Sequence, residues 1–109
     1  MAIYFKSFNK SISAGSSSTL EWTTTEPITL KRIHVHERTG SSINNVQIYL
    51  TIDNEPRTLD YVPAALFTQK SQLQIPFDES LDAKTYIYMK ITNNESSSVN
   101  LDITFEYSK

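Results

Sequence analysis

The stretch that decides the fold reads Val99-Asn100-Leu101-Asp102-Ile103-Thr104-Phe105-Glu106-Tyr107. Apolar and polar residues alternate in it without interruption. Successive side chains of a β-strand point to opposite faces, so this pattern predicts a strand with one face in a core and the other in solvent. The same alternation recurs along the chain between Ser-, Asn-, Gly- and Pro-containing turns. It predicts an all-β protein and supplies no reactive group.

Eight segments are expected as strands. Their ranges are 3–8 (extended at most to 12), 19–25, 28–37, 44–53, 57–61, 71–77, 85–92 and 99–107. Within 28–37 the apolar positions change parity at Lys31-Arg32, which predicts a β-bulge. A tight hairpin is expected from Asp53 to Pro56, and Pro63 is expected to begin a short helical turn over 62–67. Residues 78–82 are expected to form a loop.

The length and strand pattern together predict the architecture. A chain of 109 residues has the size of one domain, so we expect a single domain over residues 1–109. Short one-sided strands with brief polar connections are typical of an antiparallel β-sandwich. A jelly-roll topology is favoured. In that topology the fourth and fifth strands form the central hairpin, which fits the tight turn expected from Asp53 to Pro56. An immunoglobulin-like Greek key is the alternative, although the chain lacks that family's Cys pair.

Composition argues against several classes of function. The chain has no Cys, which excludes a disulfide framework, a thiolate zinc site and a Cys nucleophile. A net charge of −2 is too small to attract nucleic acid, so no nucleic-acid partner is expected. No apolar run approaches the ~18 residues of a membrane span, and no membrane insertion is expected. The first residues lack the features of a signal peptide, which predicts synthesis in the cytoplasm.

The pair His34 and His36 is the one candidate metal motif. Residues two apart on a strand share a face, so both imidazoles could reach one ion. Cupins, also small jelly rolls, follow such a pair with a nearby Glu and a distant third His. Here Gly40 and Ser41 stand where that Glu would fall, and the chain has no other His. Because Val35 takes the inward position, we expect the pair to face solvent, and we expect no metal and no cofactor.

Catalysis is not expected either. The acids Glu21, Asp102 and Glu106 occupy outward strand positions, where they serve solubility rather than paired acid–base chemistry. The Ser residues cluster in turns without a nucleophile elbow, and two Gly residues cannot build a phosphate loop. We expect a protein that is not an enzyme.

Three tyrosines are the candidate partner-contact residues: Tyr49, Tyr86 and Tyr88. All three have outward parity on strands whose other face is apolar. Tyr buries a large area at low entropic cost and keeps a hydrogen-bonding tip, which enriches it in interfaces. The alternative is that strand propensity and cross-strand packing alone place them there.

The first expected strand is a second candidate contact. Ile3, Tyr4, Phe5 and Phe8 offer apolar residues to both of its faces. This pattern is typical of a strand covered twice, by its own core and by a neighbour. A poorly patterned terminal strand that packs partly at a sheet edge is the other interpretation.

Three segments carry a resemblance to a known group of proteins. They are residues 46–56 (VQIYLTIDNEP), 60–67 (DYVPAALF) and 87–94 (IYMKITNN). A strand ending in Ile-Asp-Asn, a Val-Pro helical turn, and a strand closing on Asn before a last alternating strand resemble small β-sandwich virion structural proteins of phages and archaeal viruses. The resemblance implies a capsid, spike or decoration subunit located in the virion. It implies a homo-oligomer whose partners are itself or other virion proteins, and it assigns no functional residues.

A carbohydrate-binding or lectin-like module on the same fold is the alternative function. Such modules stack sugars on exposed aromatic rings, and Tyr86 and Tyr88 could serve in this way. They share a face with Lys90 rather than with the Asp and Asn side chains that usually bind sugar hydroxyls.

Overall fold

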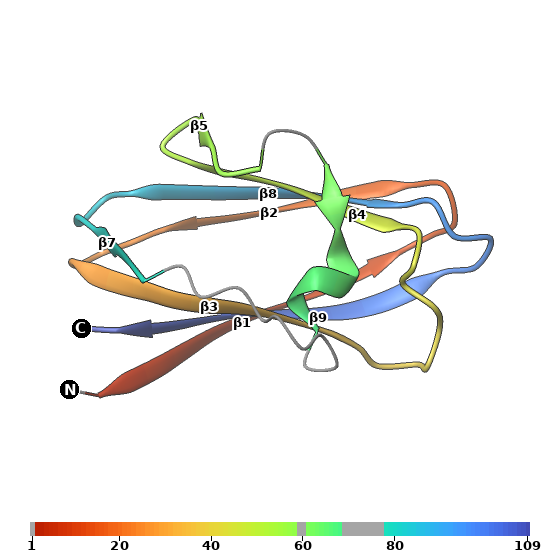
Figure 1. The fold of residues 1–109 in the computed structure, drawn as a ribbon, viewed down its shortest axis with the longest axis horizontal. Coiled ribbons are helices and arrows are strands. Elements are labelled where there is room, and N and C mark those ends of the chain that lie inside the picture. Colours follow the sequence, from red (N-terminus) through yellow and green to blue (C-terminus); the bar gives the residue numbers. More distant parts are fainter. Residues whose placement is uncertain (1, 59–60, 69–77) are drawn as a thin grey trace.

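The computed structural model describes residues 2–58, 61–68 and 78–109. In this part of the chain all regular structure is strand, apart from one 3-10 turn, in agreement with the expected all-β class (Figure 1). The elements are β1 (Ile3–Ile12), β2 (Ser17–Thr23), β3 (Ile28–Glu37), β4 (Val46–Ile52), β5 (Glu55–Pro56), β6 (Val62–Pro63), η1 (Ala64–Phe67), β7 (Glu79–Leu81), β8 (Tyr86–Asn93) and β9 (Val99–Ser108).

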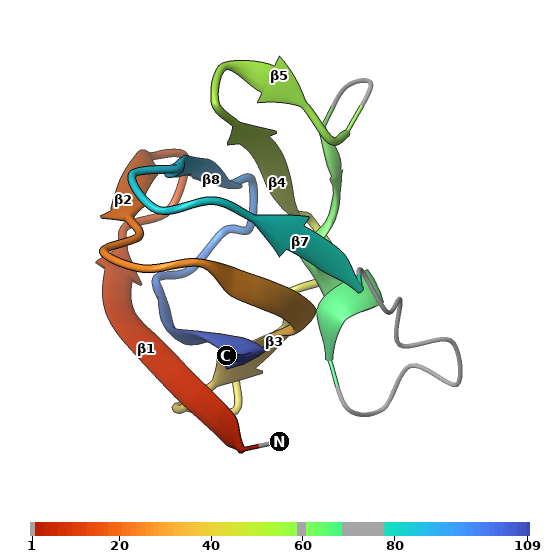
Figure 2. The same cartoon turned by 90° about the vertical axis from the view of Figure 1, so that its left-hand side faces the viewer.

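The strands form two antiparallel sheets that pack against each other (Figures 1 and 2). The first sheet has the order β1-β9-β3-β7, and the second has the order β2-β8-β4-β5 with β6 also paired to β4. The pairs are nested about the β4–β5 turn: β1 pairs with β9, β2 with β8, and β3 with β7. The antiparallel β-sandwich expected from the sequence is confirmed.

Alternating residues of both sheets fill the space between them. Leu101, Ile103 and Phe105 of β9 are fully buried, and so are the alternate positions Ile87 and Met89 of β8. These are the positions that the period-two pattern assigns to the core. Burying a Leu, Ile or Phe side chain contributes roughly 1.5–3 kcal/mol each, so this cluster provides most of the drive for folding.

Two local features explain how the strands keep their register. The register between β3 and β9 shifts between Leu30 and Arg32, which confirms the expected bulge and lets Leu30 and Ile33 both face the core. Asp53 and Asn54 have positive φ angles of 51° and 63° and join β4 to β5. A two-residue hairpin needs this conformation to match the twist of its strands, and Asp and Asn tolerate it better than most residues.

Some expectations for the middle of the chain are wrong. No strand covers Arg57 and Thr58 of the expected segment 57–61; the pairing with β4 comes instead from β5 and β6, two residues each. The loop expected over 78–82 contains β7, which pairs with the start of β3. The strand expected over 71–77 lies outside the described residues.

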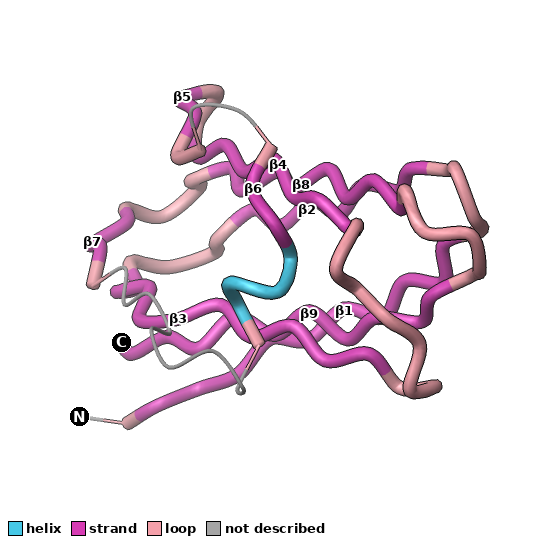
Figure 3. The backbone as a smooth tube through the Cα atoms, turned by 45° about the vertical axis from the view of Figure 1, so that its right-hand side comes forward, coloured by secondary structure: helices cyan, strands magenta, loops and turns pink. Residues whose placement is uncertain are grey.

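The helical turn after β6 is confirmed. It is the 3-10 turn η1, which contacts both β3 and β4 and so lies between the two sheets (Figure 3). Ala64 and Phe67 of this turn are buried in the core cluster. Pro63 precedes the turn in an extended conformation, so it caps η1 rather than forming its first residue.

Candidate contact surface

The outer face of the second sheet places the three candidate tyrosines together. Tyr86 and Tyr88 follow each other at alternate positions of β8, and their ring centroids are 6.4 Å apart. Tyr49 lies on the adjacent strand β4, where Thr51 is opposite Tyr88, so Tyr49 is a diagonal neighbour of Tyr88. The intervening Ile87 is fully buried, which turns the tyrosines outward as the sequence predicts.

Tyr61 is a fourth member of this cluster, and the alternation pattern does not predict it. Its ring centroid is 5.7 Å from that of Tyr49. It precedes β6, and the register Ile48 opposite Val62 brings this segment back beside β4. A sequence signal for it is its place directly before the Val-Pro turn, because Val62 pairs with Ile48 of β4. We call Tyr49, Tyr61, Tyr86 and Tyr88 the tyrosine surface.

Charged neighbours make the tyrosine surface amphipathic. Glu21 of β2 is opposite Tyr88, and Lys90 of β8 is opposite Tyr49. A hydrogen bond to the Glu21 carboxylate, together with some desolvation, raises the pKa of the Tyr86 phenol above its ordinary value of 10.0. The phenol therefore keeps its proton at neutral pH. The surface offers rings, hydroxyl donors and both signs of charge, which suits protein–protein contact.

The histidine pair lies on the outer face of the first sheet, as expected, but one member is engaged. Nε2 of His34 lies 2.8 Å from Oε1 of Glu106, and the Arg32 guanidinium lies 3.4 Å from the same carboxylate. His36 is exposed and is opposite Asp102. No group of three or more potential metal-ligating acids and histidines occurs within residues 2–58, 61–68 and 78–109.

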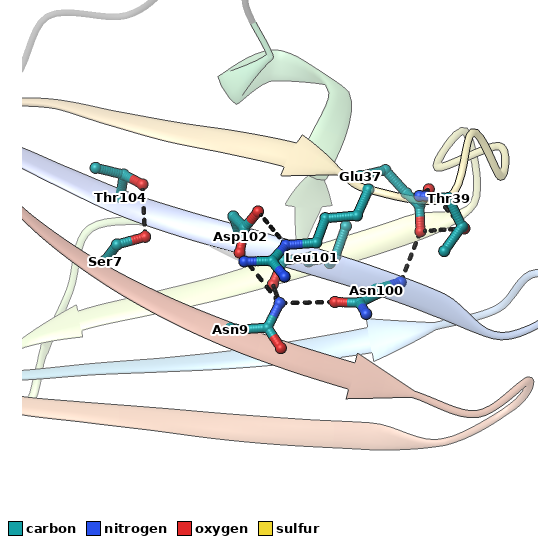
Figure 4. Close-up of polar contacts among 9 residues, drawn as sticks. Ser7, Asn9, Glu37, Thr39, Asn100, Leu101, Asp102 and Thr104 are labelled. Carbon is teal, nitrogen blue, oxygen red and sulfur yellow. Dashed lines mark hydrogen bonds and ion pairs between the residues drawn. The ribbon is translucent and has the colours of Figure 1, made fainter.

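A polar network covers the same face between β1, β9 and the end of β3 (Figure 4). Nε of Arg38 donates to Oδ2 of Asp102 at 2.7 Å, and the Asn9 amide donates to the other carboxylate oxygen at 3.1 Å. The hydrogen bond from Arg38 is the main cause that lowers the pKa of Asp102. Asn9 also donates to the side chain of Asn100 at 2.6 Å. This network holds the edge strand β1 to β9.

Glu37 organises the turn that follows β3. Its carboxylate accepts hydrogen bonds from the backbone N–H groups of Thr39 and Asn100, both at 2.6 Å (Figure 4). It also accepts one from the backbone N–H of Ser41 at 3.0 Å. Desolvation alone would raise the pKa of Glu37, but the hydrogen bonds from Asn100, Thr39 and Ser41 together outweigh it and lower the pKa below 4.5. The role of Glu37 is therefore structural.

Replacing Glu37 with alanine is expected to destabilise the fold by about 1–3 kcal/mol at pH 7, because it removes the acceptor for partly buried N–H groups. A group with a lowered folded-state pKa stabilises fully above its unfolded pKa and loses this contribution as the pH falls through the folded value. The difference between wild type and Glu37→Ala should therefore shrink below pH 4.5. Urea unfolding at a series of pH values measures it. A difference that is constant with pH would contradict this role.

A small cleft lies beside the end of β2 and the turn that joins it to β3, with Lys6 of β1 and Tyr107 of β9 on its other side. Its volume is about 320 Å³. The Trp22 ring lies 5.3 Å from Tyr107 and 5.4 Å from Phe105, measured between centroids. The lining residues are Lys6, Trp22, Thr23, Thr24, Thr25, Glu26, Ile28 and Tyr107. Aromatic faces beside hydroxyl and charged groups make this cleft a second candidate site.

Comparison with known proteins identifies no family for the chain. It matches no protein-family model, and no curated protein is significantly similar to it. Among the residues that the structure describes, no helix is long and apolar enough to span a membrane.

Proposed function

We propose that this protein is a non-enzymatic structural subunit of a virus particle: a capsid, spike or decoration protein whose sandwich is a jelly roll. It is made in the host cytoplasm and acts in the virion through contacts with copies of itself or with other virion proteins. These contacts involve neither nucleic acid nor insertion into a membrane.

The nested strand pairing supports the jelly-roll topology. A jelly roll results when one long antiparallel ribbon, closed by a central hairpin, is rolled into two sheets. Such a ribbon pairs the outermost strands first, as β1 does with β9 and β2 with β8, and ends at the central hairpin, here β4 with β5. Rolling then brings β9 beside β3 and β8 beside β4.

The tyrosine surface is the observation that carries the proposed function. Four tyrosine rings lie together on the outer face of a sheet. Tyrosine has few rotatable bonds and the sheet is rigid, so little conformational entropy is lost when such rings bind a partner. The segments that resemble virion proteins, 46–56, 60–67 and 87–94, contribute Tyr49, Tyr61 and Tyr88. The resemblance and the candidate contact thus involve the same part of the sandwich.

The double variant Tyr86→Ala/Tyr88→Ala is expected to weaken assembly at least tenfold. An interface tyrosine that acts as a hot spot contributes about 2 kcal/mol or more to association, and each 1.4 kcal/mol is a factor of ten. Both side chains face outward but are half-buried, so the free energy of unfolding should fall by about 1–2 kcal/mol. Native mass spectrometry of the protein co-expressed with the products of neighbouring genes measures the association.

The matched control is Gln47→Ala, an outward and exposed position on β4 in the same sheet. It should assemble like wild type. Equal association of the wild type, the control and the double variant would show that the tyrosine surface is not the contact.

A carbohydrate-binding module is the second candidate function, and the cleft beside Trp22 favours it. Sugars stack their apolar faces on aromatic rings, and the exposed hydroxyls of Thr23 and Thr25 could bind sugar hydroxyls there, together with the Glu26 carboxylate that also pairs with Lys109. A glycan array that shows binding, weakened by Glu26→Gln without a change in thermal unfolding, would support it. An array without a bound glycan would remove it.

A further inference from the structure

The edge strand β1 exposes an unusual run of apolar residues. Ile3, Tyr4 and Phe5 are 47, 38 and 64% exposed, and together with Leu66 they are the exposed large hydrophobic residues of the described chain. The three are consecutive and lie on a strand at the border of the first sheet, as Figure 2 shows. Scattered exposed apolar residues are ordinary, whereas a contiguous set on a sheet edge marks a pairing site.

The other border strands of the described sheets are shorter than β1. Among the described strands, the opposite borders are β7 with three residues and β5 with two, and the remaining border β2 has seven. β1 has ten residues and pairs with β9 on one side. Its second row of backbone N–H and C=O groups faces away from β9, where another strand can pair with it.

The two faces of β1 differ in what they offer a partner. Tyr4 and Lys6 are opposite Tyr107 and Phe105, so they share the core side, and Nζ of Lys6 lies 5.5 Å above the Phe8 ring. Ile3 and Phe5 therefore project from the outer side. A partner strand must tolerate lysine on one face and apolar groups on the other.

We propose that β1 pairs antiparallel with β1 of a second copy of this chain, about a two-fold axis centred on Phe5. This pairing would join the first sheets of two copies into one continuous sheet. The pairing is one contact between copies of the subunit proposed above. It rests on the proposed function in one respect, namely that the protein associates with itself.

Charge argues for this register over the neighbouring one centred on Lys6. In an antiparallel pair related by a two-fold axis, the axis can pass through a residue or between two residues. Only an axis through a residue places core-side residues opposite core-side residues and outer-side residues opposite outer-side residues. A centre on Lys6 would place the two ammonium groups opposite each other, which is destabilising. A centre on Phe5 places Phe5 opposite Phe5, Ile3 opposite Ser7, and Lys6 opposite the Tyr4 ring. The outer-face side chains Ile3 and Phe5 are then covered by the partner strand, and no two lysines are opposite each other.

The contact is expected to be weak for an isolated pair of copies. A single strand pair covers less surface than the standard interface of about 1,200–2,000 Å² that a stable dimer needs. In an assembly the same contact is repeated together with others, so its effective strength rises by multivalency. A test must therefore either trap the contact or use high concentrations.

Disulfide trapping tests the register directly, because the chain has no Cys of its own. Directly opposite residues have Cα atoms about 4.5–5.5 Å apart, within the range of about 4.4–6.8 Å that a disulfide spans, so oxidised Phe5→Cys should form a covalent dimer. Ser7→Cys is the matched control: in this register the two Ser7 positions are four residues apart along the strands, about 13 Å, which is too far. A Ser7→Cys dimer, or no dimer of Phe5→Cys, would overturn the proposal.

Sedimentation over a concentration series up to about 1 mM tests the contact without a covalent link. Wild type should form dimers as the concentration rises. Phe5→Lys should lose this association at least tenfold, since it places two ammonium groups across the axis, and Leu66→Lys, at an exposed apolar site away from β1, should behave like wild type. Association of Phe5→Lys equal to that of wild type would overturn the proposal.

The two proposals can fail separately. Trapping of Phe5→Cys should be unchanged when Tyr86→Ala/Tyr88→Ala is added. Loss of assembly in the tyrosine variant without any Phe5→Cys dimer would leave the proposed function intact and reject the β1 contact.

Discussion

Replacing Phe105 with alanine is expected to reduce the free energy of unfolding by about 3–5 kcal/mol. Phe105 is fully buried on β9, and its ring meets the Phe8 ring edge to face at 6.0 Å and the Trp22 ring at 5.4 Å. The variant loses the transfer energy of the ring and leaves a cavity between the sheets. Because domains are stable by only about 5–15 kcal/mol, this loss is a large fraction of the total.

Urea unfolding followed by the emission of Trp22, the one tryptophan of the chain, measures the effect. The matched control is Phe5→Ala, since Phe5 is 64% exposed and its removal should change the free energy of unfolding by about 0.5 kcal/mol or less in dilute protein. Similar losses for the two variants would contradict the assignment of alternate β9 residues to the core.

Replacing Asn93 with alanine is expected to cost about 3 kcal/mol. The Asn93 side chain is fully buried at the end of β8. Its Nδ2 donates to the carbonyl oxygens of Ile12 and Ser97 at 3.0 and 2.9 Å, and its Oδ1 accepts from the backbone N–H of Glu95 at 2.9 Å. Each buried polar group left unpaired costs about 1–3 kcal/mol.

The variant Asn93→Asp separates hydrogen bonding from size. A carboxylate cannot donate to the two carbonyl oxygens and is repelled by them, so its pKa should rise above the ordinary value of about 3.9. The variant should be least stable at neutral pH and recover part of its stability as the pH falls and it gains a proton. Thermal unfolding at several pH values measures this. Asn94→Ala, at the exposed neighbouring position, is the control and should resemble wild type.

The architecture could be predicted because burial repeats with period two. The alternation in residues 99–107 predicts a strand with one buried face. The change in parity of the apolar residues at Lys31-Arg32 predicts a β-bulge. Both are local features. β7 could not be predicted, since Glu79, Ser80 and Leu81 show no alternation long enough to identify a strand, and they become one only by pairing with Ile28–Leu30 far away in the chain. Conversely, Arg57 and Thr58 were expected to belong to a strand, but the structure places neither of them in one.

The candidate site was predictable in part. Parity placed Tyr49, Tyr86 and Tyr88 on one face, but Tyr61 joins them through a return of the chain that no periodicity encodes. The hydrogen bonds of Glu37 and Asn93 to backbone groups could not be predicted either. A polar residue beside a turn looks the same in the sequence whether its side chain binds backbone groups or solvent. The hydrogen bonds of both depend on loops that pack against distant strands.

The native mass of the protein tests most directly whether it acts by assembly. It should be measured for the chain expressed alone at high concentration and for the chain co-expressed with the products of neighbouring genes. Wild type should form a symmetric oligomer or a larger complex, and Tyr86→Ala/Tyr88→Ala should have a smaller mass. A single-chain mass for wild type in both preparations would contradict action by assembly.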